Sequence, residues 1–216
     1  MSKKLEALIE GLNILETTGD LQTVVKGIAY DSRKVGAGDL FVAVRGTKVD
    51  GTAYIPEALK RGAEAIVAEE IPPGLENVPF IRVEDSRKAL AQIAAVFFDN
   101  PSRSFRLIGV TGTNGKTTTT LLLEAILKQA GHRVGVLGTL AYRWGEKSIA
   151  APMTTPESLD LHDLFSRMRE DSVSHVVMEV SSHALALGRV DGCLFGVGIF
   201  TNLSQDHLDF HETMED

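Results

Sequence analysis

The sequence lacks several features that would assign it to a common class of protein. It has a single cysteine, Cys193, and no CxxC pair, which excludes an internal disulfide and a cysteine-based zinc site. No apolar run approaches the roughly 18 residues that a membrane span needs. The first residues, MSKKLEALIEGL, alternate charged residues with Leu and Ile as a surface helix does. We therefore expect a soluble cytoplasmic protein without a membrane span or a signal peptide.

The chain also lacks an excess of basic residues. Its 22 lysines and arginines stand against 29 aspartates and glutamates, which gives a net charge of −7. Proteins that bind the phosphate backbone of nucleic acids usually present a basic face, so we expect no nucleic-acid partner. Any anionic ligand would have to be held by local groups. The 216 residues, 44% of them hydrophobic, are enough for two modest hydrophobic cores.

The first part of the chain has the pattern of a small α/β domain. A helical pattern at 52–61 stands among short apolar runs that we expect to be strands at 27–30, 40–44, 65–69 and 79–83. Another helical pattern follows at 86–98, and the DNPS sequence after it should end the helix because proline disfavours the α conformation in the preceding residue. We place a domain boundary on this helix, between residues 1–88 and 89–216.

The second part alternates strands and helices regularly. We expect helices at about 116–130 and 157–170, among strands at 106–110, 133–137, 175–180 and 196–201. Apolar strands separated by helices are typical of a parallel sheet that is covered on both faces. The predicted fold class is therefore α/β, with a small N-terminal α/β domain followed by a parallel-sheet domain.

The sequence GVTGTNGKTTTT at 109–120 lies between an expected strand and an expected helix. Several N–H groups at such a helix start are unpaired, and the helix dipole adds partial positive charge, so a phosphate fits there. Gly112 and Gly115 let the backbone curl around an anion. Lys116 can neutralise the β and γ phosphates of a nucleotide, and Thr117 can bind Mg²⁺ through its hydroxyl.

This motif departs from the usual phosphate-loop pattern, GxxxxGK[ST]. That pattern would need glycine where this chain has Val110. The alternative is a glycine-rich turn with a solvated lysine, and the flanking strand and helix favour the phosphate loop. A phosphate loop alone leaves a kinase, a GTPase and a ligase open.

Other motifs narrow these alternatives. The variant TGTNGKT resembles the Mur ligase family, and further similar motifs follow in the family's order: MEVSSHAL at 178–185, GRV at 188–190 and TNLSQDHLDFH at 201–211. DSRKVGAGDLFVAVRG at 31–46 resembles the uridine-binding domain of two of the family's ligases. MTTPES at 153–158 resembles the substrate loop of the members that add the third residue of the peptide. The resemblance spans about residues 27–211.

The resemblance implies an ATP-dependent amide ligase of peptidoglycan synthesis, with ATP and Mg²⁺ as cofactors. Such an enzyme transfers the γ-phosphoryl group of ATP to a carboxylate of UDP-N-acetylmuramoyl-L-alanyl-D-glutamate, which gives an acyl phosphate and ADP. The amine of a diamino acid, diaminopimelate or lysine, then attacks the acyl carbon and displaces phosphate. We expect a monomer when the protein is complete. A ligase for the terminal D-Ala-D-Ala dipeptide, folylpolyglutamate synthetase and a non-catalytic UDP-sugar-binding module are the alternatives. The substrate loop argues against the first, and the uridine domain argues against the second.

The resemblance also implies roles for individual residues. The nucleotide-binding set consists of Gly112, Thr113, Asn114, Gly115, Lys116, Thr117 and Thr118. Lys116, Glu179 and His207 are the expected catalytic residues, and Thr117, Glu179 and His207 the expected Mg²⁺ ligands. For Glu179, the alternative is a strand-end glutamate in solvent. His207 and His211 have the spacing of two zinc ligands on one face of a helix. No HExxH pattern accompanies them, so we do not expect a zinc site.

The expected substrate contacts lie in both parts of the chain. Ser32 resembles the hydroxyl that contacts the uridine diphosphate end, although a turn cap is an equal alternative for it. The backbone around Thr47, Lys48 and Val49 resembles the uracil-binding turn of the family. The positions expected to hold the muramoyl peptide are Thr154, Thr155, Ser181 and Arg189. An arginine there suits a pyrophosphate or a carboxylate by bidentate pairing.

The chain ends shortly after the HLDFH sequence. In the family, a carbamylated lysine and a third domain with the diamino acid site follow later in the chain. We therefore expect that the 216 residues alone can bind the UDP substrate but cannot form the amide.

Overall fold

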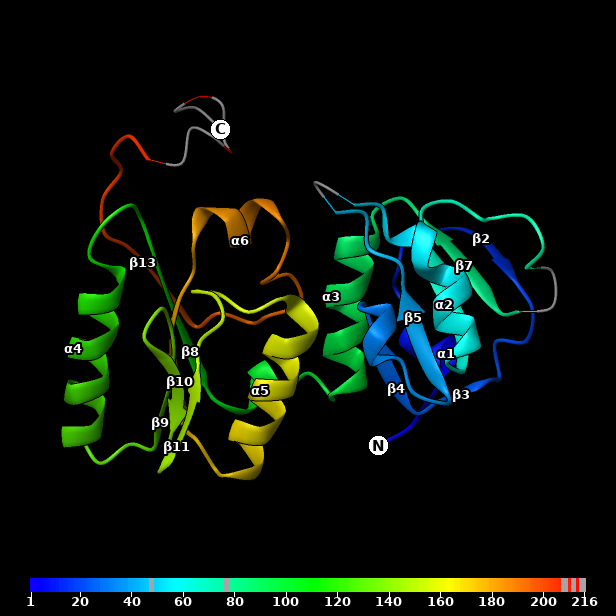
Figure 1. Cartoon of the computed structure of the whole chain (residues 1–216). Helices are drawn as coiled ribbons and strands as arrows, with labels where there is room; N and C mark the ends of the chain where they lie inside the picture. Colours follow the sequence, from blue (N-terminus) through cyan, green and yellow to red (C-terminus); the bar gives the residue numbers. More distant parts are fainter. Residues whose placement is uncertain (47–48, 76–77, 207–209, 211–212, 214–216) are drawn as a thin grey trace. The chain divides into compact units, whose positions relative to one another are not determined.

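A computed structural model describes residues 1–216 except 47–48, 76–77, 207–209, 211–212 and 214–216. The chain divides into two compact units, Met1–Asp99 (unit 1) and Asn100–Asp216 (unit 2), which we describe separately (Figure 1). The division follows helix α3 (Ser86–Phe97), whereas the predicted boundary after residue 88 falls inside it. No described helix combines the length and apolar composition that crossing a bilayer would require.

Unit 1 is built on a five-stranded sheet. Its strand order is β2 (Ile14–Thr18), β7 (Phe80–Val83), β6 (Ala63–Ala68), β5 (Asp39–Val42) and β4 (Gly27–Ala29). Strands β4 to β7 are parallel, and β2 is antiparallel to β7. The other elements are β1 (Lys3–Lys4), α1 (Leu5–Leu8), β3 (Val24–Val25), η1 (Ser32–Lys34), η2 (Gly51–Tyr54), α2 (Ile55–Lys60) and α3. The four strands predicted in this part of the chain are confirmed.

Helices α2 and α3 cover the sheet of unit 1. Ile55 of α2 packs with Phe41 and Phe80 in one buried cluster, and α3 contacts β6 and α1. The Asp85 side chain caps α3 by accepting hydrogen bonds from two backbone N–H groups of its first turn. Helix α3 ends at Phe97. Asn100, directly before Pro101, adopts a left-handed conformation.

The prediction of a surface helix at the start of the chain is wrong. Residues 3–4 form the short strand β1, which pairs with β3, and helix α1 is a single turn. Leu5 and Leu8 of that turn are fully buried (0% exposed). Their spacing of three places both on one side of the turn. The apolar residues of this segment therefore anchor it to the unit instead of lying on a solvated helix.

Unit 2 is built on a six-stranded sheet. Its strand order is β11 (Lys147–Ala150), β10 (Ala141–Trp144), β9 (Val134–Leu137), β12 (His175–Glu179), β8 (Arg106–Thr111) and β13 (Val197–Phe200). The last four strands are parallel, whereas β10 and β11 form an antiparallel hairpin on β9. The other elements are η3 (Pro101–Ser104), α4 (Lys116–Gln129), α5 (Ser158–Glu170) and α6 (Ser182–Ala186).

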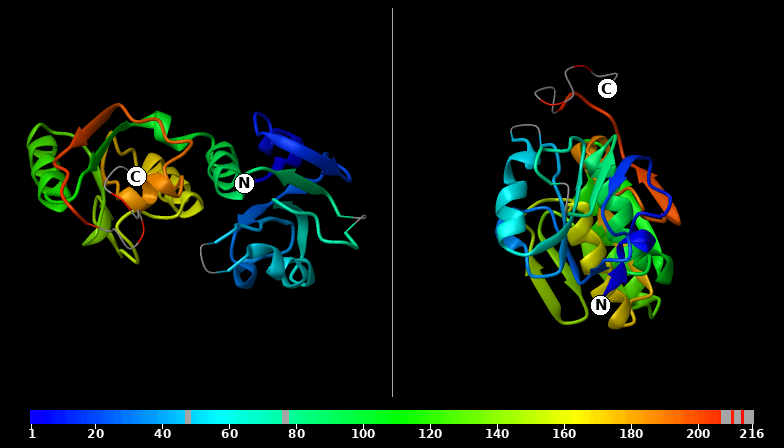
Figure 2. Two further views of the ribbon diagram at one scale, coloured as in Figure 1. Left: turned by 90° about the horizontal axis from the view of Figure 1, so that it is seen from above. Right: turned by 90° about the vertical axis from the view of Figure 1, so that its right-hand side faces the viewer.

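The sheet of unit 2 is covered on both faces, as predicted. Residues alternate along β8, so that Leu107 packs in the cluster that contains Phe165 of α5, whereas Ile108 packs in the cluster that contacts Leu123 of α4. Helices α4 and α5 lie on opposite sides of this sheet (Figures 1 and 2). The hairpin of β10 and β11 was not predicted, because its buried residues Tyr142 and Trp144 alternate with other residues and form no continuous apolar run.

Parallel pairing brings the ends of β8 and β12 to one edge of the sheet. Glu179, the last residue of β12, is in register with Val110 of β8. The GTNG loop that follows β8 therefore lies beside Glu179. Ligands of open α/β sheets bind at this carboxyl edge.

A buried histidine makes the stability of unit 2 dependent on pH. His162 of α5 is 0% exposed, and its ring packs edge-on against Phe165. Burial lowers the pKa of His162 from 6.5 to about 4. The unfolded chain therefore takes up this proton near pH 6.5 and the folded unit only near pH 4, so stability falls as the pH decreases through that interval.

We predict that the change from pH 7 to pH 5 lowers the unfolding free energy of unit 2 by roughly 2 kcal/mol through this group alone. His162→Met should abolish that loss. Trp144, the single tryptophan, lies in unit 2, so its fluorescence during urea unfolding at the two pH values reports on this unit. His132→Met, at an exposed position, is the control. An equal pH dependence in the wild type and His162→Met would contradict the prediction.

Candidate active site

The GTNG loop joins the end of β8 to the start of α4. Gly112 (φ 123°) and Gly115 (φ 86°) both adopt backbone conformations that favour glycine. Gly112 also lies against the chain segment after β13, because a Cβ at this position would fall 2.3 Å from Thr201 Oγ1. The loop thus needs glycine at position 112 for two reasons, its conformation and its close approach to Thr201.

Helix α4 starts with unpaired backbone N–H groups. Its first hydrogen bond to the loop runs from Thr119 N to Gly115 O, and no side chain caps the helix. Within the described residues, the N–H groups of Lys116, Thr117 and Thr118 therefore have no acceptor. Unpaired N–H groups and the positive end of the helix dipole together form an anion site.

The ammonium group of Lys116 lies over the loop. Its Nζ donates to Gly112 O at 2.6 Å and to Thr113 O at 2.9 Å. An ammonium group has three donors, so one remains for a ligand. The positive charge is therefore held next to the unpaired N–H groups of α4.

Residues 201–204, which follow β13, hold the loop from one side. Asn202 accepts from Thr113 N through its backbone O at 2.9 Å and from Asn114 N through Oδ1 at 3.0 Å. Asn114 O accepts from Asn202 Nδ2 at 3.0 Å and from Thr201 Oγ1 at 2.7 Å. Ser204 N donates to Thr113 Oγ1 at 2.9 Å. We call residues 201–204 the loop clamp.

The loop clamp reduces the number of predicted nucleotide-binding residues whose backbone N–H groups are free for a ligand. Thr113 and Asn114 use their N–H groups within the chain, so they hold the shape of the loop, whereas Lys116, Thr117 and Thr118 keep theirs for a ligand. Residues 201–204 belong to the TNLSQDHLDFH motif, which was assigned by its resemblance to the family. Their hydrogen bonds to the GTNG loop were not predicted.

Glu179 is buried beside the start of α4. Only 2% of it is exposed. Its Oε2 accepts from Thr117 Oγ1 at 3.0 Å and from Thr139 Oγ1 at 3.1 Å, and its Oε1 accepts from Thr139 N at 3.0 Å. The alternative of a glutamate in solvent is therefore wrong. Sequence reasoning missed Thr139, for which the only signal was its position just after a predicted strand.

The predicted peptide-binding residues come together next to Glu179. Thr155 Oγ1 donates to Glu179 O at 2.9 Å and accepts from Ser181 N at 3.1 Å. Thr154 Oγ1 lies 3.1 Å from Thr139 Oγ1. Hydrogen bonds thus bring Thr154, Thr155 and Ser181 next to Glu179 and Thr139, but Thr155 is only 1% exposed, so its hydroxyl joins Glu179 to Ser181 inside the chain and is not on the surface.

Arg189 is already engaged within the chain. Its Nη1 donates to Thr155 O at 3.3 Å, and its Nε lies 3.2 Å from Glu157 Oε1, with both side chains less than one-fifth exposed. A ligand anion would therefore share the guanidinium with Glu157 instead of having all of its donors.

In unit 1, Ser32 is 6% exposed, and its Oγ donates to Glu57 Oε2 at 2.8 Å. This hydrogen bond is the main reason that the pKa of Glu57 lies below its usual value. The cap of η1 is Asp31, which accepts from Arg33 N, so Ser32 is not the cap that was the alternative for it. Val49 is 52% exposed and closes a turn by accepting from Gly46 N. Thr47, Lys48 and His207 lie outside the described residues.

Two family models match the chain. One, described as the Mur ligase middle domain, matches residues 110–216, and the other, described as the Mur ligase family, catalytic domain, matches residues 24–98. The chain belongs to the Mur ligase family. The family resemblance drawn from the motifs is thereby confirmed.

Two similar Mur ligases are named UDP-N-acetylmuramoyl-L-alanyl-D-glutamate–2,6-diaminopimelate ligase. The one from Caldanaerobacter subterraneus subsp. tengcongensis is 49% identical over 213 residues, which cover 99% of this chain and 44% of that protein. The one from Geobacter metallireducens is 48% identical over 212 residues, which cover 98% and 42%. The chain therefore spans less than half the length of these relatives.

Solved structures of Mur ligases have the same fold. A structure of a UDP-N-acetylmuramoyl-L-alanyl-D-glutamate–2,6-diaminopimelate ligase matches with a TM-score of 0.81 and 26% identity, over 100% of this chain and 43% of that one. The MurF ligase of Thermotoga maritima in complex with ADP matches with a TM-score of 0.58 and 28% identity, over 88% and 40%. The predicted α/β fold is confirmed.

The residues of this Mur ligase chain fit the predicted Mg²⁺ in part. Thr117 Oγ1 and Glu179 Oε2 are oxygen atoms 3.0 Å apart at the start of α4, and Mg²⁺ prefers such ligands. The described residues contain no cluster of three or more His, Cys, Asp or Glu that could hold a metal ion. A Mg²⁺ ion at this position would therefore take most of its ligands from phosphates and water, as is usual for nucleotide-bound Mg²⁺.

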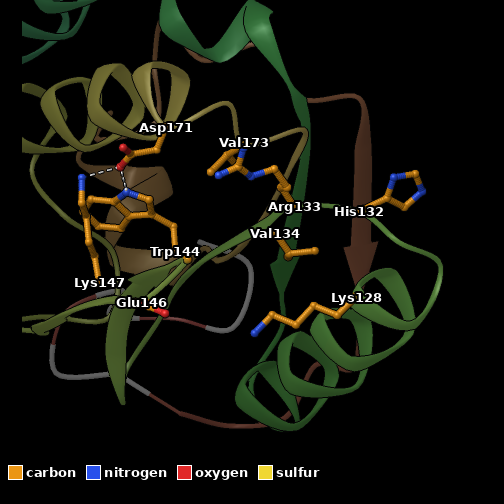
Figure 3. A pocket seen from close by; sticks show the side chains of 10 residues that line it. Lys128, His132, Arg133, Val134, Trp144, Glu146, Lys147, Asp171 and Val173 are labelled. Carbon is orange, nitrogen blue, oxygen red and sulfur yellow. Dashed lines mark hydrogen bonds and ion pairs between the residues drawn. The ribbon is translucent and has the colours of Figure 1, made fainter.

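A pocket of about 470 Å³ lies at the other edge of the unit 2 sheet (Figure 3). Residues at the end of α4, at the start of β9 and in the turn between β10 and β11 line it. Trp144 Nε1 and Lys147 Nζ, which belong to this lining, both donate to Asp171. Because the loop and Glu179 lie at the carboxyl ends of β8 and β12, this pocket is separate from the candidate active site.

We predict that Gly112→Ala lowers the affinity for ADP at least about tenfold, equivalent to about 1.4 kcal/mol. The new Cβ would meet Thr201 Oγ1 and Asn202 O, and so would separate the loop from the loop clamp. Binding of a fluorescent ADP analogue measures the effect. Gly131→Ala is the control, because Gly131 also has a positive φ (85°) but nothing within 4 Å of the added Cβ. Equal affinities of the two variants would rule out the role of the clamp.

Proposed function

We propose that the protein containing this chain is an ATP-dependent amide ligase that adds a diamino acid to UDP-N-acetylmuramoyl-L-alanyl-D-glutamate in peptidoglycan synthesis. The observation that carries the proposal is the contact between two sites: the anion site of α4 and the predicted peptide residues both adjoin the buried Glu179. The names of the similar proteins favour diaminopimelate over lysine as the diamino acid.

Amide formation from a carboxylate at neutral pH needs a leaving group. Transfer of the γ-phosphoryl group of ATP to the carboxylate gives an acyl phosphate, and attack by the amine then forms the amide and releases phosphate. The transferred group carries distributed negative charge, so catalysis consists mainly of positioning and charge neutralisation. The N–H groups of residues 116–118 and the ammonium group of Lys116 supply this at the anion site.

Thr117 and Glu179 are the proposed protein ligands of Mg²⁺, which when bound would neutralise further phosphate charge. His207 remains a proposed ligand of a second Mg²⁺. Thr154, Thr155, Ser181 and Arg189 are proposed to hold the peptide, so that its carboxylate faces the anion site. The catalytic set is then Lys116, Glu179 and His207.

Unit 1 is proposed to bind the uridine diphosphate end of the substrate. Ser32 and the turn that Val49 closes, together with Thr47 and Lys48, are the proposed contacts. Because the hydroxyl of Ser32 donates to Glu57, it must turn from Glu57 in order to donate to a phosphate oxygen. We also propose that the complete protein acts as a monomer in the cytoplasm, where Cys193 stays reduced.

The test is phosphate release from ATP by the complete gene product, with the UDP-muramoyl dipeptide and either diaminopimelate or lysine. We expect release that depends on the amino acceptor and yields the UDP-muramoyl tripeptide. Lys116→Ala should lower the rate at least about 100-fold, as loss of a group that stabilises transition-state charge does, and leave binding of the UDP substrate nearly unchanged.

Lys128→Ala, at the opposite end of α4, is the control and should keep the wild-type rate. Release that is equally fast without an amino acceptor would count against a ligase. A wild-type rate in Lys116→Ala would remove the lysine from the catalytic set.

A further inference from the structure

Thr139 joins the two halves of the candidate active site. It follows β9, and both its N–H and its hydroxyl donate to Glu179, the N–H to Oε1 at 3.0 Å and the hydroxyl to Oε2 at 3.1 Å. On its other side, Thr139 Oγ1 lies 3.1 Å from Thr154 Oγ1. Thr139 is thus in contact with both the predicted metal ligand and the predicted peptide loop.

The two donors of Thr139 fix the orientation of the carboxylate. Each binds a different oxygen of Glu179, so rotation of the carboxylate breaks at least one hydrogen bond. The backbone before Thr139 also approaches closely, because a Cβ at Gly138 would fall 2.3 Å from Glu179 Oε1. The segment from Gly138 to Thr139 therefore holds the carboxylate at a defined position beside Thr117.

The hydroxyl groups of Thr139 and Thr154 form a hydrogen-bond chain with one direction. Thr139 Oγ1 donates its single hydroxyl proton to Glu179 Oε2. Thr139 Oγ1 then accepts from Thr154, and Thr154 presents lone pairs to a ligand. A substrate group that donates to Thr154, such as a peptide N–H, is compatible with this chain.

We propose that Thr139 is a positioning residue that orients Glu179 for a divalent cation and, through Thr154, couples cation binding to binding of the muramoyl peptide. The proposal rests on the proposed function, because it takes Glu179 as a cation ligand and residues 153–158 as the peptide loop. Residues that orient a metal ligand in this way commonly contribute substantially to metal affinity.

The test is a titration of the complete gene product with Mn²⁺ in the presence of ADP. The electron paramagnetic resonance signal of free Mn²⁺ measures how much remains unbound. Thr139→Val removes the hydroxyl at nearly constant shape and should weaken Mn²⁺ binding about tenfold. Thr139→Ser retains the hydroxyl and should restore the affinity to within about twofold of the wild type. Thr18→Val, in unit 1, is a control that also removes a threonine hydroxyl.

A second measurement tests the coupling. In the wild type, the UDP-muramoyl dipeptide should change the Mn²⁺ affinity, and this change should be lost in Thr139→Val. Thr154→Val keeps all the hydrogen bonds of Glu179, so it should retain the Mn²⁺ affinity but lose the coupling, measured at a dipeptide concentration that saturates the variant. If Thr139→Val does not fold, as judged by circular dichroism, Thr154→Val and Thr139→Ser still test the proposal.

The outcomes separate this proposal from the proposed function. Wild-type protein that binds neither ADP nor Mn²⁺ would overturn the proposed function and this proposal with it. Wild-type binding that is unchanged in Thr139→Val, or coupling that persists in Thr154→Val, would overturn only the role of Thr139.

Discussion

The buried carboxylate of Glu179 is the constraint on which the architecture of the site depends. A carboxylate that is 2% exposed is strongly destabilising unless hydrogen-bond donors replace its water. Donors for it come from the start of α4 and from the end of β9, through Thr117 and Thr139. Both positions follow from parallel pairing, which brings the ends of β8, β9 and β12 to one edge of the sheet.

The GTNG loop satisfies a second constraint next to the first. Its backbone must leave N–H groups free at the start of α4, yet its remaining polar groups need partners. The loop clamp supplies them, since Thr201 and Asn202 bind the backbone of Asn114, and Asn202 and Ser204 bind the backbone and the side chain of Thr113. The rigid part of the loop is thus held by the chain, and the free N–H groups lie where the helix dipole adds positive charge.

Much of the fold could be predicted because its signals are local. The apolar runs of β8 and β12 and the glycines of the phosphate loop indicate strands and a turn from their immediate neighbours. The context of Lys116, between a strand and a helix, followed from the same local signals. Unit 1 was accessible in the same way from β4 onward. Before it, strands β2 and β3 were not predicted, and the two leucines of α1 are buried by contacts with the rest of the unit.

The remaining features depend on contacts between residues far apart in the chain. Thr139 approaches Glu179 across 40 residues, and Asn202 approaches Asn114 across 88. The pairing of Ser32 with Glu57 is of the same kind, and it shows why the choice between a substrate contact and a cap could not be made from spacing alone. A single sequence carries no local pattern for such pairs, because either partner would read as an ordinary polar loop or helix residue.

We propose that the Glu179 carboxylate connects nucleotide binding to a divalent cation. The most direct measurement is calorimetric titration of ATP into the complete gene product, with and without Mg²⁺, for the wild type and Glu179→Gln. Glutamine keeps the size of the side chain and removes its charge. We expect Mg²⁺ to strengthen ATP binding to the wild type and to have little effect on Glu179→Gln. An equal gain from Mg²⁺ in both proteins would contradict it.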